Sequence, residues 1–166
     1  EPVLNLVYIS QSYGLQEVAD YWEQVIIMND HQKRRFAKKI VKTLFNTVSG
    51  KKIAIMGWAF KKDTNDTRES AAIYVADYLL NEQAEITVYD PKVTAEQIYS
   101  DLNYLGTRSD EENRRLLKVV TDPMKAVERA HATAILLSFI HILRCRRSPL
   151  FRSCWSAYLH THNTSS

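Results

Sequence analysis

The polar loop at residues 57–70 carries the side chains best suited to binding an anionic ligand. It reads GWAFKKDTNDTRES and holds three cations, Lys61, Lys62 and Arg68, beside three acids. A strand is expected over 51–56 and a helix after the loop. Cations and free backbone N–H groups at the mouth of such a strand–loop–helix unit commonly bind a phosphate-bearing ligand in an open α/β sheet. An ordinary solvated loop explains the pattern equally well.

Other residues near this loop permit more than one interpretation. Asp66 followed by Glu69 is a capping-box pattern, which predicts a helix over about 67–80. Gly57 stands alone, so the G-x-G-x-x-G signal for a dinucleotide pyrophosphate is absent from the sequence. Asp90 ends the next strand, where a ribose-binding acid would lie, but an aspartate before a proline more often ends a strand in a turn.

The second half of the chain predicts alternating strands and helices. Further strands are expected over 85–89, 117–121 and 132–137, and helices over 95–102 and 123–129, the latter with Asp122 as N-cap. Residues 103–117 are expected to form a loop with a helical turn. This order implies an α/β fold with an incomplete Rossmann-like parallel sheet and helices on both faces. Right-handed crossovers then place the loops after Ile55, Tyr89 and Leu136 at the carboxyl edge.

The first part of the chain predicts two helices. Residues 3–13 are so densely apolar that periodicity does not separate a buried helix from a strand. A helix is favoured, because Gly14 suits the position after a helix end. Residues 15–45 contain no proline or glycine and carry an apolar stripe, which predicts one long helix of roughly 45 Å. Such a helix usually connects two domains or pairs with a partner helix. Its basic cluster over 33–39 is best interpreted as a solvated face, with phosphate contact as the weaker alternative.

Composition and charge limit the classes of function. The 166 residues are 45% hydrophobic and 25% charged, as in ordinary globular proteins. Neither an apolar run near 18 residues nor a signal sequence is found, so a cytoplasmic protein without membrane contact is expected. The net charge of +3 is concentrated in four arginines of residues 138–166, so nucleic-acid binding is not expected.

The last residues, 138–166, break the strand–helix pattern. They are expected to be poorly ordered, because they end in a run of Ser, Thr, His and Asn. The cysteines and histidines of this segment fit no zinc spacing, so no metal site is expected. They are Cys145, Cys154, His141, His160 and His162.

The loop sequence GWAFKKDTNDTRES resembles the UDP-glucose/GDP-mannose dehydrogenase family. VLNLVY, EVADYW, LFNTV and VYDPKV resemble the same family in the same order, over about residues 3–136. The segment KKDTNDTRES is more similar to that of the family members that act on UDP-glucose than to that of members that act on GDP-mannose or UDP-N-acetylmannosamine. The resemblance implies a fragment with a central helical connector and dimerisation region at 1–47, part of the UDP-binding domain at 48–137, and a divergent segment at 138–166.

The resemblance also implies an activity and its site residues. The family oxidises the C6 alcohol of the sugar twice with two NAD, here UDP-glucose to UDP-glucuronate, through a thioester on a cysteine. By resemblance Phe60 and Lys61 contact the UDP-sugar, and Arg68 reaches NAD. The long helix would join subunits in a homo-oligomer.

The catalytic residues of the family find no match here. Its nucleophilic cysteine lies just before VLNLVY, where this chain has Glu1 and Pro2, and Pro2 takes the place of an aspartate that assists water. The catalytic lysine and most of the NAD site belong to an N-terminal domain that matches nothing in this sequence. No catalytic residue is therefore assigned, and the chain alone is expected to be inactive. The alternative function is a non-catalytic nucleotide-sugar-binding module or a helix-mediated assembly module.

Overall fold

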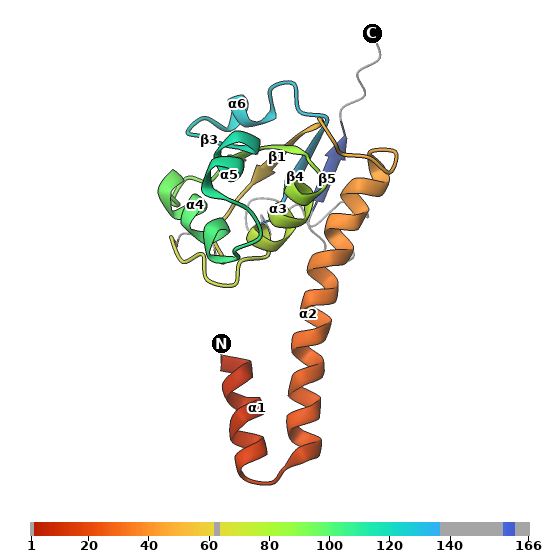
Figure 1. Ribbon diagram of the computed structural model, residues 1–166, viewed down its shortest axis with the longest axis vertical. Coiled ribbons are helices and arrows are strands. Elements are labelled where there is room, and N and C mark those ends of the chain that lie inside the picture. Colours follow the sequence, from red (N-terminus) through yellow and green to blue (C-terminus); the bar gives the residue numbers. More distant parts are fainter. Residues whose placement is uncertain (1, 62–63, 137–157, 162–166) are drawn as a thin grey trace, which may run out of the picture. The chain divides into compact units, whose positions relative to one another are not determined.

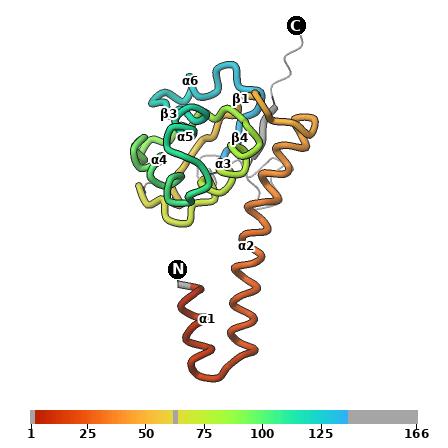
Figure 2. Tube along the Cα trace, in the orientation of Figure 1, coloured from red at the N-terminus to blue at the C-terminus, as the bar shows by residue number. Residues whose placement is uncertain are grey.

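A computed structural model describes residues 2–61, 64–136 and 158–161 of the chain (Figure 1). The chain divides into two compact units, Glu1–Arg35 and Phe36–Ser166. The first unit consists of helices, and the second contains the sheet. The backbone trace of Figure 2 follows the same order of elements along the chain.

The first unit is a pair of helices joined by a tight turn. Helix α1 spans Pro2–Ser12, and α2 spans Gln16–Thr43 and continues into the second unit. Gly14 has φ +70, a conformation that glycine adopts without steric cost, and the N–H of Leu15 donates to the carbonyl of Ser10 at 2.9 Å. The helix favoured over residues 3–13 because of Gly14 and the long helix predicted from the apolar stripe of residues 15–45 are both confirmed.

The second unit is built on one sheet with strand order β3-β2-β1-β4-β5. The first four strands are parallel, whereas β5 pairs antiparallel with β4. The strands are β1 (Lys52–Met56), β2 (Glu85–Tyr89), β3 (Leu117–Val120), β4 (Ala132–Ile135) and β5 (Tyr158–Thr161). The predicted α/β class and parallel Rossmann-like sheet are confirmed.

Helices connect these strands. They are α3 (Ala71–Asn81), α4 (Ala95–Tyr104), α5 (Asp110–Leu116) and α6 (Pro123–Val127). Asp122 caps α6 as predicted, since its side chain accepts from the N–H of Met124. Residues 110–116 form a full short helix where only a helical turn was expected, because the side chain of Ser109 accepts from the N–H of Glu112 and caps it.

The predicted start of the helix after the polar loop is wrong. Ser70, rather than Asp66, is the N-cap of α3, because its side chain accepts from the N–H of Ala72. Glu69 has φ +58 and cannot belong to a right-handed helix. The carboxylate of Asp66 instead pairs with Arg68. Neither Asp66 nor Glu69 therefore caps α3, and the predicted capping box is not formed.

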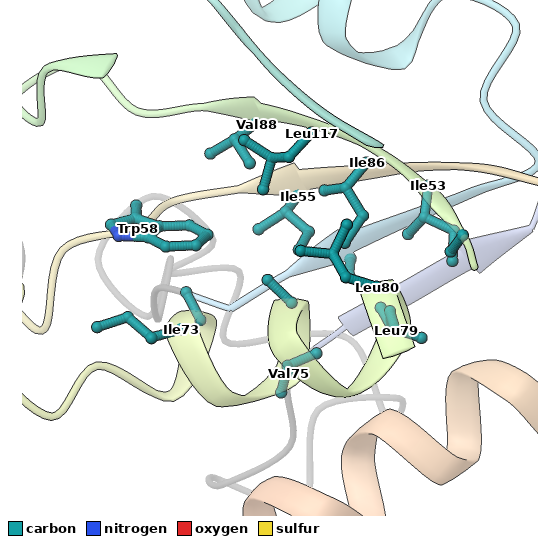
Figure 3. Close-up of a cluster of buried hydrophobic side chains, with 14 of the residues drawn as sticks. Ile53, Ile55, Trp58, Ile73, Val75, Leu79, Leu80, Ile86, Val88 and Leu117 are labelled. Carbon is teal, nitrogen blue, oxygen red and sulfur yellow. The ribbon is translucent and has the colours of Figure 1, made fainter. Parts of the chain in front are cut away.

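The core of the second unit lies between the sheet and α3. Figure 3 shows Ile53 and Ile55 of β1 in one buried cluster with Leu79 and Leu80 of α3. The branched side chains of β1 and β2 suit a strand that is buried within a parallel sheet. The last turns of α2 belong to this core through Ala37 and Ile40, and Leu44, directly after the helix, belongs to it as well.

Two expectations concern segments that the structure describes only in part. One is the poor order expected for residues 138–166, of which the structure describes only the backbone of β5. The other is the expected absence of a metal site in that segment. Its candidate ligands lie outside the described residues; they are Cys145, Cys154, His141 and His162. Within the described ranges, no helix is long and apolar enough to cross a membrane.

Candidate functional site

The polar loop lies at the carboxyl edge of the parallel sheet, as the crossover rule predicts. It begins where β1 ends, and the loops after β2 and β4 begin at the same edge. The N–H of Gly57 donates to the carbonyl of Tyr89 at 2.9 Å, and that of Leu136 donates to the carbonyl of Met56 at 3.2 Å. This edge is where ligands bind in open α/β sheets, so the loop is in position to contact one.

Asp90, at the end of β2, binds four backbone N–H groups. Its Oδ2 accepts from Trp58 at 2.7 Å and Ala59 at 3.1 Å, and its Oδ1 accepts from Lys92 at 2.8 Å and Val93 at 3.0 Å. The side chain is buried. A carboxylate satisfied in this way joins two loops and offers little to a ribose, so the structure favours the turn interpretation of Asp90.

Trp58 and helix α4 are joined by a second set of polar contacts. The indole Nε1 of Trp58 donates to Oδ2 of Asp101 at 2.9 Å, and Gln97 donates to Oδ1 of the same carboxylate at 2.8 Å. Gln97 also approaches the hydroxyl of Thr67 at 3.5 Å. Helix α4 therefore contacts residues near both ends of the polar loop.

The two predicted UDP-sugar contacts lie together on the surface of the loop. Phe60 is 50% exposed, and Nζ of Lys61 lies 5.6 Å from the centre of its ring, within the range of a cation–π contact. The N–H of Phe60 donates to the carbonyl of Asp66 at 2.7 Å, which closes the loop across its base. Phe60 and Lys61 thus present an aromatic face and a positive charge to solvent at the sheet edge. Lys62 lies outside the described residues.

Arg68 lies near the C-terminal end of the loop and forms an ion pair with Asp66. Its Nε and Nη2 donate to the two carboxylate oxygens of Asp66, each at 2.9 Å. These hydrogen bonds, with a backbone one from the N–H of Arg68, lower the pKa of Asp66 from 3.8 to about 2, and Lys61 adds a weaker attraction. The same pairing raises the pKa of Arg68. The Arg68 side chain remains 88% exposed and could meet a second anion.

Sequence reasoning missed the residues that hold the loop in place. Asp101 and Gln97 are four apart on an amphipathic helix, where a polar pair usually marks a solvated face. The sequence does not single out Trp58, because nothing in it shows which group accepts the hydrogen bond of the indole N–H. Across the ranges that the structure describes, no three His, Cys, Asp or Glu side chains gather as a metal site would require.

Comparisons with known proteins agree with this architecture. Residues 54–146 match the UDP binding domain of the UDP-glucose/GDP-mannose dehydrogenase family. The chain is 55% identical over 133 residues to UDP-glucose 6-dehydrogenase of Rattus norvegicus, covering 80% of this chain and 27% of the rat protein. It is 53% identical over 134 residues to UDP-glucose 6-dehydrogenase of Drosophila melanogaster, covering 80% of this chain and 28% of the fly protein.

A solved structure supports the same fold. A UDP-glucose dehydrogenase from the hyperthermophilic archaeon Pyrobaculum islandicum superposes with a TM-score of 0.59 at 22% identity, covering 84% of this chain and 29% of that one. The present chain therefore spans less than a third of the length of these relatives. The family match begins within β1 and includes the polar loop and all the elements from there to β4. This chain belongs to the UDP-glucose/GDP-mannose dehydrogenase family and contains its UDP-binding domain.

Proposed function

We propose that this chain is the UDP-sugar-binding part of an NAD-dependent UDP-glucose 6-dehydrogenase, which converts UDP-glucose and two NAD to UDP-glucuronate. The observation that carries the proposal is the identity of 55% to the rat UDP-glucose 6-dehydrogenase over 80% of this chain. In this proposal residues 48–137 bind the nucleotide sugar, and residues 1–47 connect and associate subunits. A cytoplasmic location belongs to the same proposal, and fractionation of cells expressing the tagged chain would test it.

Phe60 and Lys61 are the proposed contacts of the UDP-sugar. The half-exposed ring of Phe60 offers an apolar face on which a planar base or a sugar ring can pack. The ammonium of Lys61 supplies a positive charge suited to a diphosphate. Both side chains are exposed at the carboxyl edge of the sheet, where the α/β architecture binds ligands.

In this proposal the described residues supply only a small part of the NAD site. A pyrophosphate cradle needs free N–H groups after the first strand, and here those of Trp58 and Ala59 are bound to Asp90. Among the proposed site residues, Arg68 alone is assigned to NAD, with its exposed guanidinium as the contacting group. The proposal therefore places most of the NAD site in protein regions that this sequence does not match.

The chain is proposed to bind without catalysing. The family's cysteine, lysine and aspartate positions have no counterpart in these residues, so no group here is assigned to hold the substrate covalently or to move its proton. The purified chain mixed with UDP-glucose and NAD should form no NADH above a protein-free control. Steady NADH formation that scales with chain concentration would refute this part of the proposal.

Calorimetric titration with UDP and UDP-glucose tests the binding part. Lys61→Ala removes the charge-assisted contact to the diphosphate, which we expect to cost roughly 1.4 kcal/mol of binding free energy. UDP should therefore bind about tenfold more weakly. Lys52→Ala is the matched control, since Lys52 is also exposed but starts β1, the strand that ends at the loop. Equal affinities for the two variants would remove Lys61 from the site, and the absence of binding by the unaltered chain would refute the proposed function.

Helix-mediated assembly is the second candidate function, and the exposed apolar surface of the first unit favours it. Tyr8, Tyr13 and Tyr21 are 73%, 78% and 64% exposed, and several aliphatic side chains of α1 and α2 are also exposed. Apolar surface of this extent commonly marks an interaction site. Sedimentation should show association that is weakened in Tyr8→Ser/Tyr21→Ser. Tyr104→Ser is the control, since Tyr104 is 91% exposed but lies in the second unit. A monomeric unaltered chain would exclude assembly.

A further inference from the structure

Trp58 is held at two points by carboxylates from outside the polar loop. Its side chain is fully buried, its backbone N–H donates to Asp90 at 2.7 Å, and its indole N–H donates to Asp101 at 2.9 Å. Asp90 follows β2 and Asp101 lies on α4, so two separate elements fix one residue. Removing either carboxylate would leave a buried N–H group without its acceptor, which is costly.

The Asp90 contact fixes the backbone where the loop begins. The same oxygen that accepts from Trp58 also accepts from Ala59, and the other oxygen is held by Lys92 and Val93. The carboxylate therefore has little freedom to rotate. Because β2 is hydrogen-bonded to β1, the beginning of the loop is tied to the sheet itself.

The Asp101 contact fixes the side chain of Trp58 and extends to the other end of the loop. Gln97 donates to Asp101 at 2.8 Å and approaches the buried Thr67 at 3.5 Å. Thr67 follows Asp66, whose carbonyl accepts from the N–H of Phe60 at 2.7 Å. Hydrogen bonds with Asp90 and with helix α4 therefore hold the loop at both of its ends.

We propose that Asp90 and Asp101 are positioning residues for the UDP-sugar site: by fixing Trp58 they set where Phe60 and Lys61 lie. Phe60 is only two residues beyond Trp58, within roughly 7 Å along the chain, so a displaced tryptophan moves both side chains. The inference rests on the proposed binding of the UDP-sugar by Phe60 and Lys61. Since Asp90 already accepts from the N–H groups of Trp58 and Ala59, these two groups are not free to bind a phosphate.

Asp90→Asn tests the backbone contact. The amide places an N–H₂ group where one carboxylate oxygen stood, so one pair of backbone N–H groups loses its acceptor. UDP should bind at least about tenfold more weakly, and the amide signals of Phe60 and Lys61 should shift in ¹⁵N NMR spectra. Asp122→Asn is the matched control, since Asp122 also precedes a proline shortly after a strand and asparagine is an equally good N-cap. The control should bind within twofold of the unaltered chain.

A milder pair of variants tests the side-chain contact if Asp90→Asn fails to fold. Trp58→Phe keeps an aromatic ring but removes the indole N–H together with part of the buried ring, while Asp101→Leu removes the acceptor and leaves the ring in place. Both should weaken UDP binding several-fold and shift the Phe60 and Lys61 amides. Asp101→Asn retains an oxygen that can accept from the indole, so it should restore near-normal binding, which a loss of stability alone would not explain.

The outcomes separate this inference from the proposed function. Unchanged Phe60 and Lys61 amide signals in folded Trp58→Phe and Asp101→Leu would overturn the positioning role, whether or not UDP binds. Shifted signals together with weaker UDP binding would support it. If the unaltered chain binds no UDP, the proposed function fails, and the amide signals alone then decide whether the carboxylates position the loop.

Discussion

Arg108 is the centre of a partly buried polar cluster between α3 and α5, and replacing it should strongly destabilise the second unit. Its side chain is 6% exposed. The guanidinium donates to the carboxylate of Asp77, to the carbonyl of Asp77 at 3.3 Å, to the side-chain oxygen of Asn81 and to that of Asn113 at 3.2 Å. Arg108→Met keeps a similar length of side chain and removes every one of these donors.

The size of the effect follows from the burial of the partners. Asp77 is 17% exposed, and the loss of one member of a buried ion pair typically costs about 3–5 kcal/mol. The hydroxyl of Thr107 still donates to Asp77 at 2.6 Å, so the carboxylate keeps one partner. We therefore expect the lower end of that range, about 3 kcal/mol of the free energy of unfolding. With a typical urea dependence, the unfolding midpoint should fall by about 1–2 M.

Urea unfolding followed by circular dichroism measures this loss. Arg115→Met is the matched control, because Arg115 is an exposed arginine of α5, the helix that Arg108 precedes, and its replacement should change the free energy of unfolding by less than about 0.5 kcal/mol. A cycle with Asp77→Ala should give a coupling energy above about 1 kcal/mol. If Arg108→Met costs less than about 1 kcal/mol, or no more than the control, the reasoning from burial and unpaired acceptors is refuted.

Three further predictions concern the core, the sheet and the loop. Leu79→Ala should cost about 2–5 kcal/mol in urea unfolding, because Leu79 is fully buried on α3; a cost below about 1 kcal/mol would contradict its place in the core. Tyr99→Phe should cost about 1 kcal/mol, since the Tyr99 hydroxyl donates to the carbonyl of Leu117 at 3.1 Å, and an unchanged unfolding midpoint would argue against that bond. The pKa of Asp66 is lowered by Arg68 to about 2, below its ordinary 3.8, so their pairing is present above about pH 4 and is lost as the pH falls through about 2. An NMR titration of the Asp66 carboxyl with a midpoint near 4 would disagree with the paired geometry.

Local patterns in the sequence determined the order and type of the main elements. The apolar stripe of residues 15–45 predicts the long helix, Gly14 favours a helix over residues 3–13, and the short branched runs around Ile53 and Ile86 predict parallel strands. These features follow from residues near one another along the chain, so they can be recognised without knowing what lies across the fold. The resemblance of the polar loop named the family, and the match over 54–146 confirms it.

The positions of Phe60, Lys61 and Arg68 were marked by the resemblance, but their surroundings were decided by the tertiary structure. Periodicity cannot show that Arg68 would pair with Asp66, because a short polar loop has many conformations of similar energy. The predicted capping box failed for that reason: the competing ion pair and the cap at Ser70 gave a different start to the helix.

Only the folded chain shows what holds the loop. The backbone N–H of Trp58 meets Asp90, 32 residues away, and its indole N–H meets Asp101, 43 residues away. Neither partner can be inferred from spacing, because hydrogen bonds between distant residues depend on how the strands and helices pack. The sequence thus determined which residues are offered at the sheet edge, and tertiary contacts between buried polar groups decided how they are held there.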